Sequence, residues 1–283
     1  MKRGRIRQSL ANWNGALMFY TCLPVPNQWP LAFDTTARWA PWVGVVVGSL
    51  LAITDLMLLR LGMPVLVCST LVIALWLVLT GGLHLDGVMD TADGLAVPDH
   101  NRRLTVMADS RMGAFGGMAA VMLLLLKVVA LSHFVEGGFA DRFFGLIAVC
   151  AWGRWGQQWA IARYPYLKKE GKGAFHKAAF PSIGYTLPSL VAMILISVVL
   201  AFLGVVSTPV MLQTTLGGFT LALLTSAYFA RQLGGHTGDT YGAVVEWTET
   251  LLLCFLTVPV VTGSIPILTA SDLTASIITA LIG

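Results

Sequence analysis

Charged residues are scarce in this chain. Asp, Glu, Lys and Arg together make up 11% of its 283 residues, whereas apolar residues make up 56%. A soluble domain typically carries about 25% charged residues. The composition therefore excludes an ordinary soluble domain and predicts an all-α, polytopic membrane bundle, because helices satisfy their own backbone groups in lipid. We expect a single integral membrane catalytic domain over residues 1–283.

The cysteines lack the spacing of a metal or redox site. There are four, none of them in a Cys-X-X-Cys pair, and three fall inside long apolar runs. Free cysteines in such surroundings behave as small hydrophobic residues. The sequence therefore predicts no disulfide framework and no cysteine-based metal centre.

A secretory cleavage signal is also missing from the N-terminus. The basic head at residues 2–7 precedes only a short apolar patch, residues 16–25, which ends in two prolines. This patch is too short to cross a membrane, for which about 20 apolar residues are needed. We expect an interfacial or re-entrant helix there.

Apolar runs long enough to span a bilayer are abundant. About 20 consecutive apolar residues suffice, and seven runs qualify: 42–61, 64–83, 114–135, 142–161, 186–206, 209–229 and 250–271. Residues 272–283 hold one more apolar patch, too short to span alone. The sequence therefore predicts about seven transmembrane helices.

Basic residues collect on one side of these spans. The N-terminal segment and the connections 84–113, 162–185 and 230–249 carry most of the Lys and Arg, and alternation of the spans places all four on the same side. The positive-inside rule makes that side cytoplasmic. All long polar connections can then meet at one membrane edge, which favours an enzyme over a transporter with a mid-membrane site.

The most informative segment follows the second span. Asp86, Asp90 and Asp93 are spaced i, i+4 and i+7, so they share a helix face. Like charges at this spacing repel by about 0.2–0.5 kcal/mol per pair, and hard divalent cations prefer carboxylate oxygens. We interpret the segment as a metal site; the alternative is a solvated helix end. Nearby, Asp109 is a further candidate ligand and Arg111 a candidate phosphate fork.

Two more connections carry candidate residues. Lys168 and Lys172 interleave with glycines, and they indicate either a phosphate-binding loop or a topology signal. The third connection holds Arg231, His236, Asp239 and Glu246 around a Gly-rich start that could present N–H groups to phosphate. Its alternative interpretation is an ordinary interhelical turn.

Three charges fall inside predicted spans: Asp55, Lys127 and Arg154. Such residues are costly in lipid and suggest function by default. Arg154 is expected near the cytoplasmic end of its span, within reach of the site. Asp55 and Lys127 could instead pair or extend toward the interface.

The motifs at residues 19–26, 81–94, 109–116 and 234–239 together resemble those of the cobalamin 5′-phosphate synthase family, the adenosylcobinamide-GDP ribazoletransferases. The resemblance implies a Mg²⁺-dependent enzyme of the bacterial inner membrane, with its active site on the cytoplasmic face. Such an enzyme joins adenosylcobinamide-GDP to α-ribazole or its 5′-phosphate and releases GMP.

On this resemblance, the site residues take the following roles. Mg²⁺ is held by Asp86, Asp90, Asp93 and Asp109, and either Asp109 or Asp239 removes the hydroxyl proton. Candidates for binding the substrate and its phosphates are Arg111, Arg154, Lys168, Lys172, Arg231, His236 and Glu246.

Two other functions stay open. Asp90-Thr-Ala-Asp93-Gly94 is similar to the motif of the CDP-alcohol phosphotransferases, but Val97-Pro98 stands where those enzymes have Ala-Arg. A divalent cation transporter would need more acids deep within spans than Asp55. The expected partners are the two substrates and the lipid bilayer, with a homo-oligomer possible and no nucleic acid.

Overall fold

The chain forms a helical bundle in its computed structural model, which describes residues 2–109, 111–134, 138–168, 173–178 and 180–259, with only the backbone for residues 2–5. Helices account for all its regular elements, and no strand forms among the described residues. The all-α membrane fold is thus confirmed. The elements are α1 (Lys2–Tyr20), α2 (Thr36–Arg60), α3 (Val65–Thr80), α4 (Leu83–Leu95), α5 (His100–Val106), α6 (Ala114–His133), α7 (Gly138–Arg163), α8 (Ala174–Ala178), η1 (Ile183–Thr186), α9 (Leu187–Phe202), α10 (Thr208–Leu212), η2 (Gln213–Gly217), α11 (Gly218–Leu233) and α12 (Gly238–Leu256).

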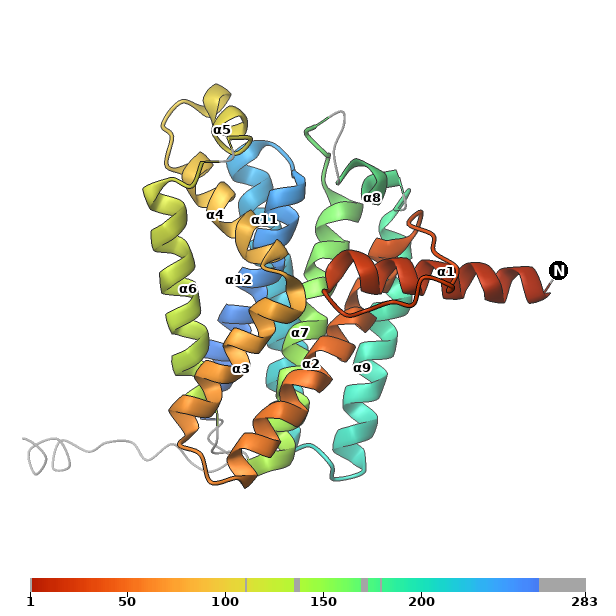
Figure 1. Cartoon of the computed structure of the whole chain (residues 1–283), viewed down its shortest axis with the longest axis vertical. Helices are drawn as coiled ribbons and strands as arrows, with labels where there is room; N and C mark the ends of the chain where they lie inside the picture. Colours follow the sequence, from red (N-terminus) through yellow and green to blue (C-terminus); the bar gives the residue numbers. More distant parts are fainter. Residues whose placement is uncertain (1, 110, 135–137, 169–172, 179, 260–283) are drawn as a thin grey trace, which may run out of the picture.

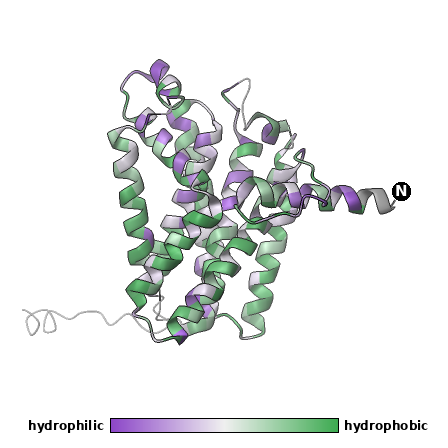
Figure 2. Cartoon of the chain, in the orientation of Figure 1, coloured by the Kyte–Doolittle hydropathy of each residue, from purple (hydrophilic) through white to green (hydrophobic). Residues whose placement is uncertain are grey.

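Four helical rods in the described part of the chain are long and apolar enough to cross a membrane: Thr36–Arg60, Ala114–His133, Ile183–Phe202 and Thr208–Leu233. The bent pair α3 and α4 could count as a fifth. Helices α7 and α12 are comparably long but carry charges inside the bundle. The outer helices are green over most of their length in Figure 2, as a lipid-facing surface requires. The count of seven spans stays a prediction, and the end of the seventh run, together with the 272–283 patch, lies outside the described residues.

Helix α12 corrects one boundary. It begins at Gly238, whereas the predicted span began at residue 250, so much of the predicted 230–249 connection is helical. The reason is local: Thr237 and Thr240 form a reciprocal capping box at its start. Tyr241, Val244 and Val245 then bury their side chains completely or nearly so. The first turns of α12 therefore belong to the packed bundle.

The α3–α4 junction sets the position of the acidic motif, the segment 84–94 that carries Asp86, Asp90 and Asp93. Gly81 and Gly82 have φ of 59° and 69°, a left-handed conformation that glycine adopts without steric cost. Two such residues in succession end α3 and turn the chain by 90° into α4. Helix α4 consequently leaves the direction of α3 and lies toward the same end of the bundle as α5 and α8 (Figure 1).

Helix α1 runs across the bundle and not along it (Figure 1). It packs on α2, where Trp13 meets Trp39 edge-to-face with ring centroids 5.6 Å apart. It is absent from the spanning helices, in agreement with the expected non-spanning N-terminal helix, but it starts at Lys2 and not near Ala16.

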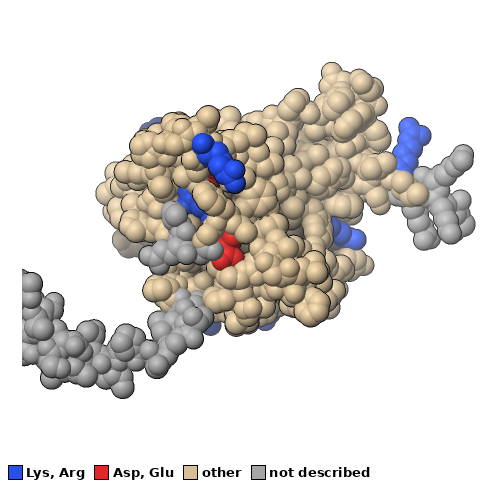
Figure 3. Space-filling view, turned by 90° about the horizontal axis from the view of Figure 1, so that it is seen from below, with Lys and Arg blue, Asp and Glu red and all other residues tan. Residues whose placement is uncertain are grey.

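The end of the bundle opposite to the acidic motif is poor in charge. Seen from below, it is mostly tan, with only a few Lys, Arg, Asp or Glu side chains in view (Figure 3). Polar residues concentrate instead around α4, α5 and the neighbouring connections (Figure 2). The candidate site is therefore at the α4 end.

Candidate functional site

The acidic motif is held against α12 by two glycines. A methyl group on Gly87 would clash with the carbonyl oxygen of Asp239, and one on Gly242 would come within 3.1 Å of the backbone of His84. Only hydrogen at these positions lets the two helices approach so closely. The contact brings Asp86 on α4 and Asp239 on α12 to the wall of one pocket, although 153 residues separate them (239 − 86).

The carboxylates of Asp86, Asp90 and Asp239 interact electrostatically. Burial, followed by the charges of Asp86 and Asp239, raises the pKa of Asp90 to about 6. The opposing charge of Lys168 is too weak to cancel that effect. The site thus concentrates negative charge, which a bound cation would relieve.

The donor chemistry fits a hard cation such as Mg²⁺, which takes oxygen ligands from one or two carboxylates and from substrate phosphates. In the described part of the chain, however, no three His, Cys, Asp or Glu side chains are gathered closely enough to bind one ion among themselves. The carboxylates present suit a metal that also takes ligands from its substrate.

The connections 162–185 and 230–249 meet the connection 84–113 at this end of the bundle. Lys168 Nζ donates to Asp239 Oδ2 at 3.1 Å, and the Thr237 hydroxyl donates to the same oxygen at 3.2 Å. The backbone N–H of Leu167 donates to the His236 carbonyl at 2.9 Å. Behind them, Arg103 donates to the Gln232 carbonyl at 2.8 Å. The predicted meeting of the three connections at one end of the bundle is therefore confirmed.

A pocket of about 120 Å³ opens beside these carboxylates. Asp86 and Asp239 lie in its wall, together with Phe19 from α1, His176 from α8 and Tyr241 from α12. Gln157 of α7 also lines it. The pocket is therefore assembled from five helices and is adjacent to the acidic group.

Asp93 has a different environment from its two predicted co-ligands. Its carboxylate accepts the N–H of Gly113 and of Gly116, both at 2.8 Å, at the start of α6. An anion at a helix N-terminus satisfies free N–H groups and interacts favourably with the helix dipole. Asp93 thus connects α4 to the start of α6. This structural role is additional to its predicted role as a metal ligand, which stays a prediction.

Three predicted substrate-binding residues are buried, and their roles stay predictions. His236 is fully buried; its ring nitrogens lie 3.0 Å from the Thr240 hydroxyl and 3.2 Å from the Ser226 carbonyl. Glu246 is 2% exposed and accepts from Lys127 Nζ at 2.6 Å. Arg154 lies nine residues before the end of α7 (163 − 154), not near it, and its Nη1 donates to Glu249 at 2.7 Å. His236 and Glu246 are thus engaged inside the protein, whereas Arg154 is buried with its Nε and Nη2 unpartnered.

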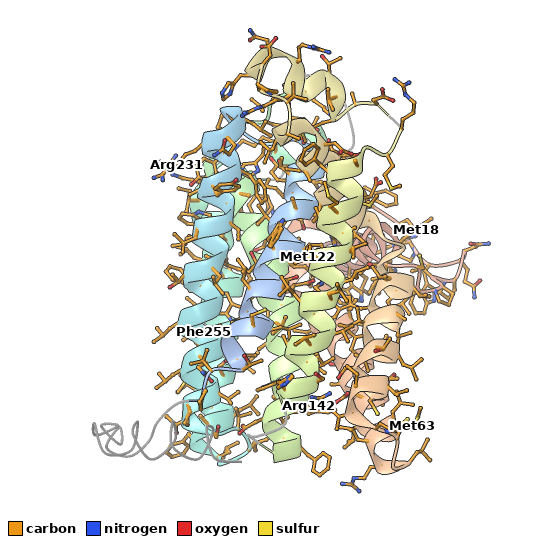
Figure 4. The ribbon with its side chains drawn as sticks, turned by 90° about the vertical axis from the view of Figure 1, so that its left-hand side faces the viewer. Met18, Met63, Met122, Arg142, Arg231 and Phe255 are labelled. Atoms are coloured by element: carbon orange, nitrogen blue, oxygen red, sulfur yellow. The ribbon has the colours of Figure 1, made fainter. Side chains whose placement is uncertain are left out.

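Asp109, Arg111 and Arg231 are not among the residues that line the pocket. Asp109 and Arg111 form an exposed pair at 2.7 Å, and the hydrogen bonds from Arg111 lower the pKa of Asp109 to about 2. Arg231 is exposed and points outward from α11 (Figure 4). Lys172 lies outside the described residues. The structure therefore brings together Asp86, Asp90, Asp239 and Lys168, and leaves Asp109, Arg111 and Arg231 apart from them.

Several pocket residues carried no assignment from the sequence. His84 lies within the acidic motif, but its type alone suggests no role. Gln157 lies in the predicted span 142–161, Tyr241 in the Gly-rich connection 230–249, and His176 in the basic connection 162–185. No local signal marks them, because they meet only through tertiary packing.

Comparisons with a family model and with individual proteins point to the same family. A family model described as cobalamin-5-phosphate synthase matches residues 12–257. The chain is 52% identical to the adenosylcobinamide-GDP ribazoletransferase of Trichormus variabilis over 256 residues, 89% of this chain and 99% of the relative. It is also 52% identical to that of Thermosynechococcus vestitus over 248 residues, 87% of this chain and 96% of the relative. No solved structure matches it.

Proposed function

The chain belongs to the cobalamin-5-phosphate synthase family, and we propose that it is a transferase that joins adenosylcobinamide-GDP to α-ribazole or α-ribazole 5′-phosphate. The products are adenosylcobalamin or its 5′-phosphate, and GMP. The observation that carries this proposal is the group of carboxylates beside a polar pocket, where α4 and α12 approach through Gly87 and Gly242. The chain aligns with the relatives named for this activity over nearly their whole length.

The chemistry is a displacement at phosphorus. A ribazole hydroxyl oxygen forms a bond to the phosphorus that carries the cobinamide arm. The bond from that phosphorus to the bridging oxygen breaks, and GMP leaves with the bridging oxygen. Positioning and electrostatics dominate such transfers, so the chain's main tasks are to align the two substrates and to receive a proton.

Asp239 is the residue we assign to the proton. It lies in the pocket wall, and its Oδ2 is held by Lys168 and Thr237 in a fixed orientation. A carboxylate can accept a proton from a hydroxyl only within hydrogen-bond reach. The first turn of α12 provides a rigid support for it.

Mg²⁺ is the cofactor we propose, with Asp86 and Asp90 as the residues that would hold it. When bound, it would offset the negative charge of the diphosphate. Burial, followed by the charges of Asp86 and Asp239, raises the pKa of Asp90, and the part due to these charges supports this assignment. Lys168 would contribute a further positive charge for the phosphates.

The protein is proposed to act in the bacterial inner membrane, with the α4 end facing the cytoplasm. The basic N-terminal segment and the basic connections at this end support that orientation. A single cysteine placed at Asn101, which is exposed, should react with a membrane-impermeant thiol reagent only from the cytoplasmic side. Labelling of Asn101→Cys from the periplasmic side alone would reverse the orientation.

The decisive experiment measures GMP release by the purified protein in detergent. GMP should form from adenosylcobinamide-GDP only when α-ribazole or its phosphate and Mg²⁺ are both present, with a matching corrinoid product. CDP-diacylglycerol with an alcohol acceptor is the control for a CDP-alcohol phosphotransferase. GMP release independent of ribazole, or turnover of CDP-diacylglycerol, would refute the proposed reaction.

A divalent cation transporter receives less support. Three acids within the bundle form ion pairs, Asp55 with Arg142, and Glu246 and Glu249 with Lys127. Uptake of Mn²⁺ into vesicles that contain the protein is expected to equal uptake into empty vesicles.

A further inference from the structure

The pocket beside the carboxylates has aromatic walls. The Tyr20 ring is stacked with the rings of His84 and His176, at centroid distances of 6.2 and 6.0 Å. Separately, Tyr241 stacks with Tyr166 at 5.9 Å. Phe19, His84, His176 and Tyr241 line the pocket itself. Flat π surfaces of this kind favour contact with a planar ring.

The same walls present polar atoms that no protein group satisfies. They are both ring nitrogens of His84, the Nε2 of His176, the Oε1 of Gln157 and the hydroxyl of Tyr241. The four residues are at most 4% exposed, and all line the pocket. Buried polar groups in native proteins nearly always have a partner, and each unpartnered one costs about 1–3 kcal/mol. Their concentration in one pocket indicates a ligand with several hydrogen-bonding atoms.

The polar groups facing this pocket are mostly neutral. Burial lowers the pKa of His176 to about 3. A neutral imidazole, an amide and a phenol offer both donors and acceptors without net charge. The negative charge is confined to Asp86 and Asp239 in the same wall.

The size of the pocket limits what enters it. A cavity of about 150 Å³ in another protein holds benzene, and this pocket measures about 120 Å³. It therefore has room for one ring, with a fused ring extending toward its opening. A corrin macrocycle is far too large.

We propose that this pocket binds the planar nitrogen heterocycle of a substrate, packed against its aromatic lining and hydrogen-bonded to His84, His176, Gln157 and Tyr241. The inference rests on the proposed function, which supplies two such rings: the base of ribazole and the guanine of the GDP arm. In either case the ring anchors its nucleotide so that the attached phosphate or hydroxyl lies at Asp86 and Asp239.

Two substitutions remove only unpartnered atoms. Tyr241→Phe deletes the free hydroxyl, and His84→Phe replaces both free ring nitrogens by an apolar ring. The matched control is Tyr228→Phe, which deletes a hydroxyl from an exposed tyrosine on α11, outside this pocket. Replacing an unsatisfied polar group by an apolar one of similar shape is nearly neutral or stabilising.

The experiment measures binding of α-ribazole and of guanosine, separately, to each purified full-length variant in detergent, together with its thermal melting. We expect Tyr241→Phe and His84→Phe each to weaken binding of at least one nucleoside about tenfold, the equivalent of about 1.4 kcal/mol. Their melting temperatures without ligand should be unchanged or higher, and Tyr228→Phe should match the wild type in both. The nucleoside that loses affinity identifies the ring.

Two results would overturn the inference. One is unchanged affinity of both variants for both nucleosides, or no binding of either by the wild type at millimolar concentration. The other is a lower melting temperature with unchanged affinity, which would show that the polar atoms hold structural water. Wild-type GMP release, measured in parallel, tests the proposed function separately, because turnover with unaltered nucleoside binding would remove the pocket assignment and leave the reaction standing.

Discussion

Inside the bundle, Lys127 and Arg154 face Glu246 and Glu249, two cations against two anions, with side chains at most 3% exposed. At the α4 end, Asp86, Asp90 and Asp239 lie in one region, and the one ion pair that the described residues form with them is Lys168 to Asp239. The first group is balanced and enclosed, whereas the second has excess negative charge and a pocket beside it. Balance of charge thus separates side chains that hold the fold from side chains available to a ligand.

The Asp55–Arg142 pair belongs with the balanced group. Arg142 Nε and Nη2 donate to the two carboxylate oxygens of Asp55 at 2.6 and 2.8 Å, and Nη1 donates to the Leu131 carbonyl. Arg142 points into the bundle in Figure 4. A two-point contact of this kind fixes α2 against α7 near the end opposite the site.

The largest effect is expected from unbalancing the buried group. Glu249→Gln leaves the charge of Arg154 without a counterion, and breaking a buried pair costs about 3–5 kcal/mol. Thermal or denaturant unfolding of the purified protein should show this loss. The double variant Lys127→Leu/Glu246→Leu removes one charge of each sign, so it should lose clearly less stability than Lys127→Leu alone. Equal losses in the double and single variants would show that the charges do not balance one another.

The second effect tests the unbalanced group. Asp90→Asn should lower turnover about 10²–10³-fold, the size expected when one electrostatic contact to a transition state is lost. Its melting temperature should be near that of the wild type or higher, because the substitution relieves repulsion. Asp34→Asn, at an exposed aspartate outside the site, is the control and should leave turnover unchanged. Near-normal turnover of Asp90→Asn with unaltered Mg²⁺ dependence would remove Asp90 from the metal site.

The smallest effect separates the two roles of Asp93. If its main contribution is to cap α6, Asp93→Ala should cost about 0.5–2 kcal/mol, as the loss of an N-terminal cap does. The Mg²⁺ concentration at half-maximal turnover should then match that of the wild type. A large increase in that concentration, with unchanged stability, would instead make Asp93 a metal ligand.

The sequence was most informative where the signal was local. The apolar runs, the spacing of Asp86, Asp90 and Asp93, and the alternation of basic connections predicted the helical bundle and the meeting of three motifs at one end. Glu246 shows where this reasoning fails. Its partner Lys127 is 119 residues away in the chain, and no pattern in the sequence selects one buried cation over another. The pocket residues Gln157, His176 and Tyr241 were missed for the same reason, since each comes from a different helix.

The length of α3 has a mechanical consequence. Its 16 residues extend about 24 Å at 1.5 Å per residue, whereas the hydrocarbon core of a bilayer is about 30 Å thick. If α3 starts at the opposite boundary, the Gly81–Gly82 bend falls short of the ordinary one, and we expect the surrounding lipid to thin to meet it. Turnover in vesicles of short-chain lipids should exceed turnover in long-chain ones, and equal rates would contradict this account. A thinned membrane would form a shallow depression around α4, through which a water-soluble nucleotide could reach chemistry set below the level of the neighbouring lipid headgroups.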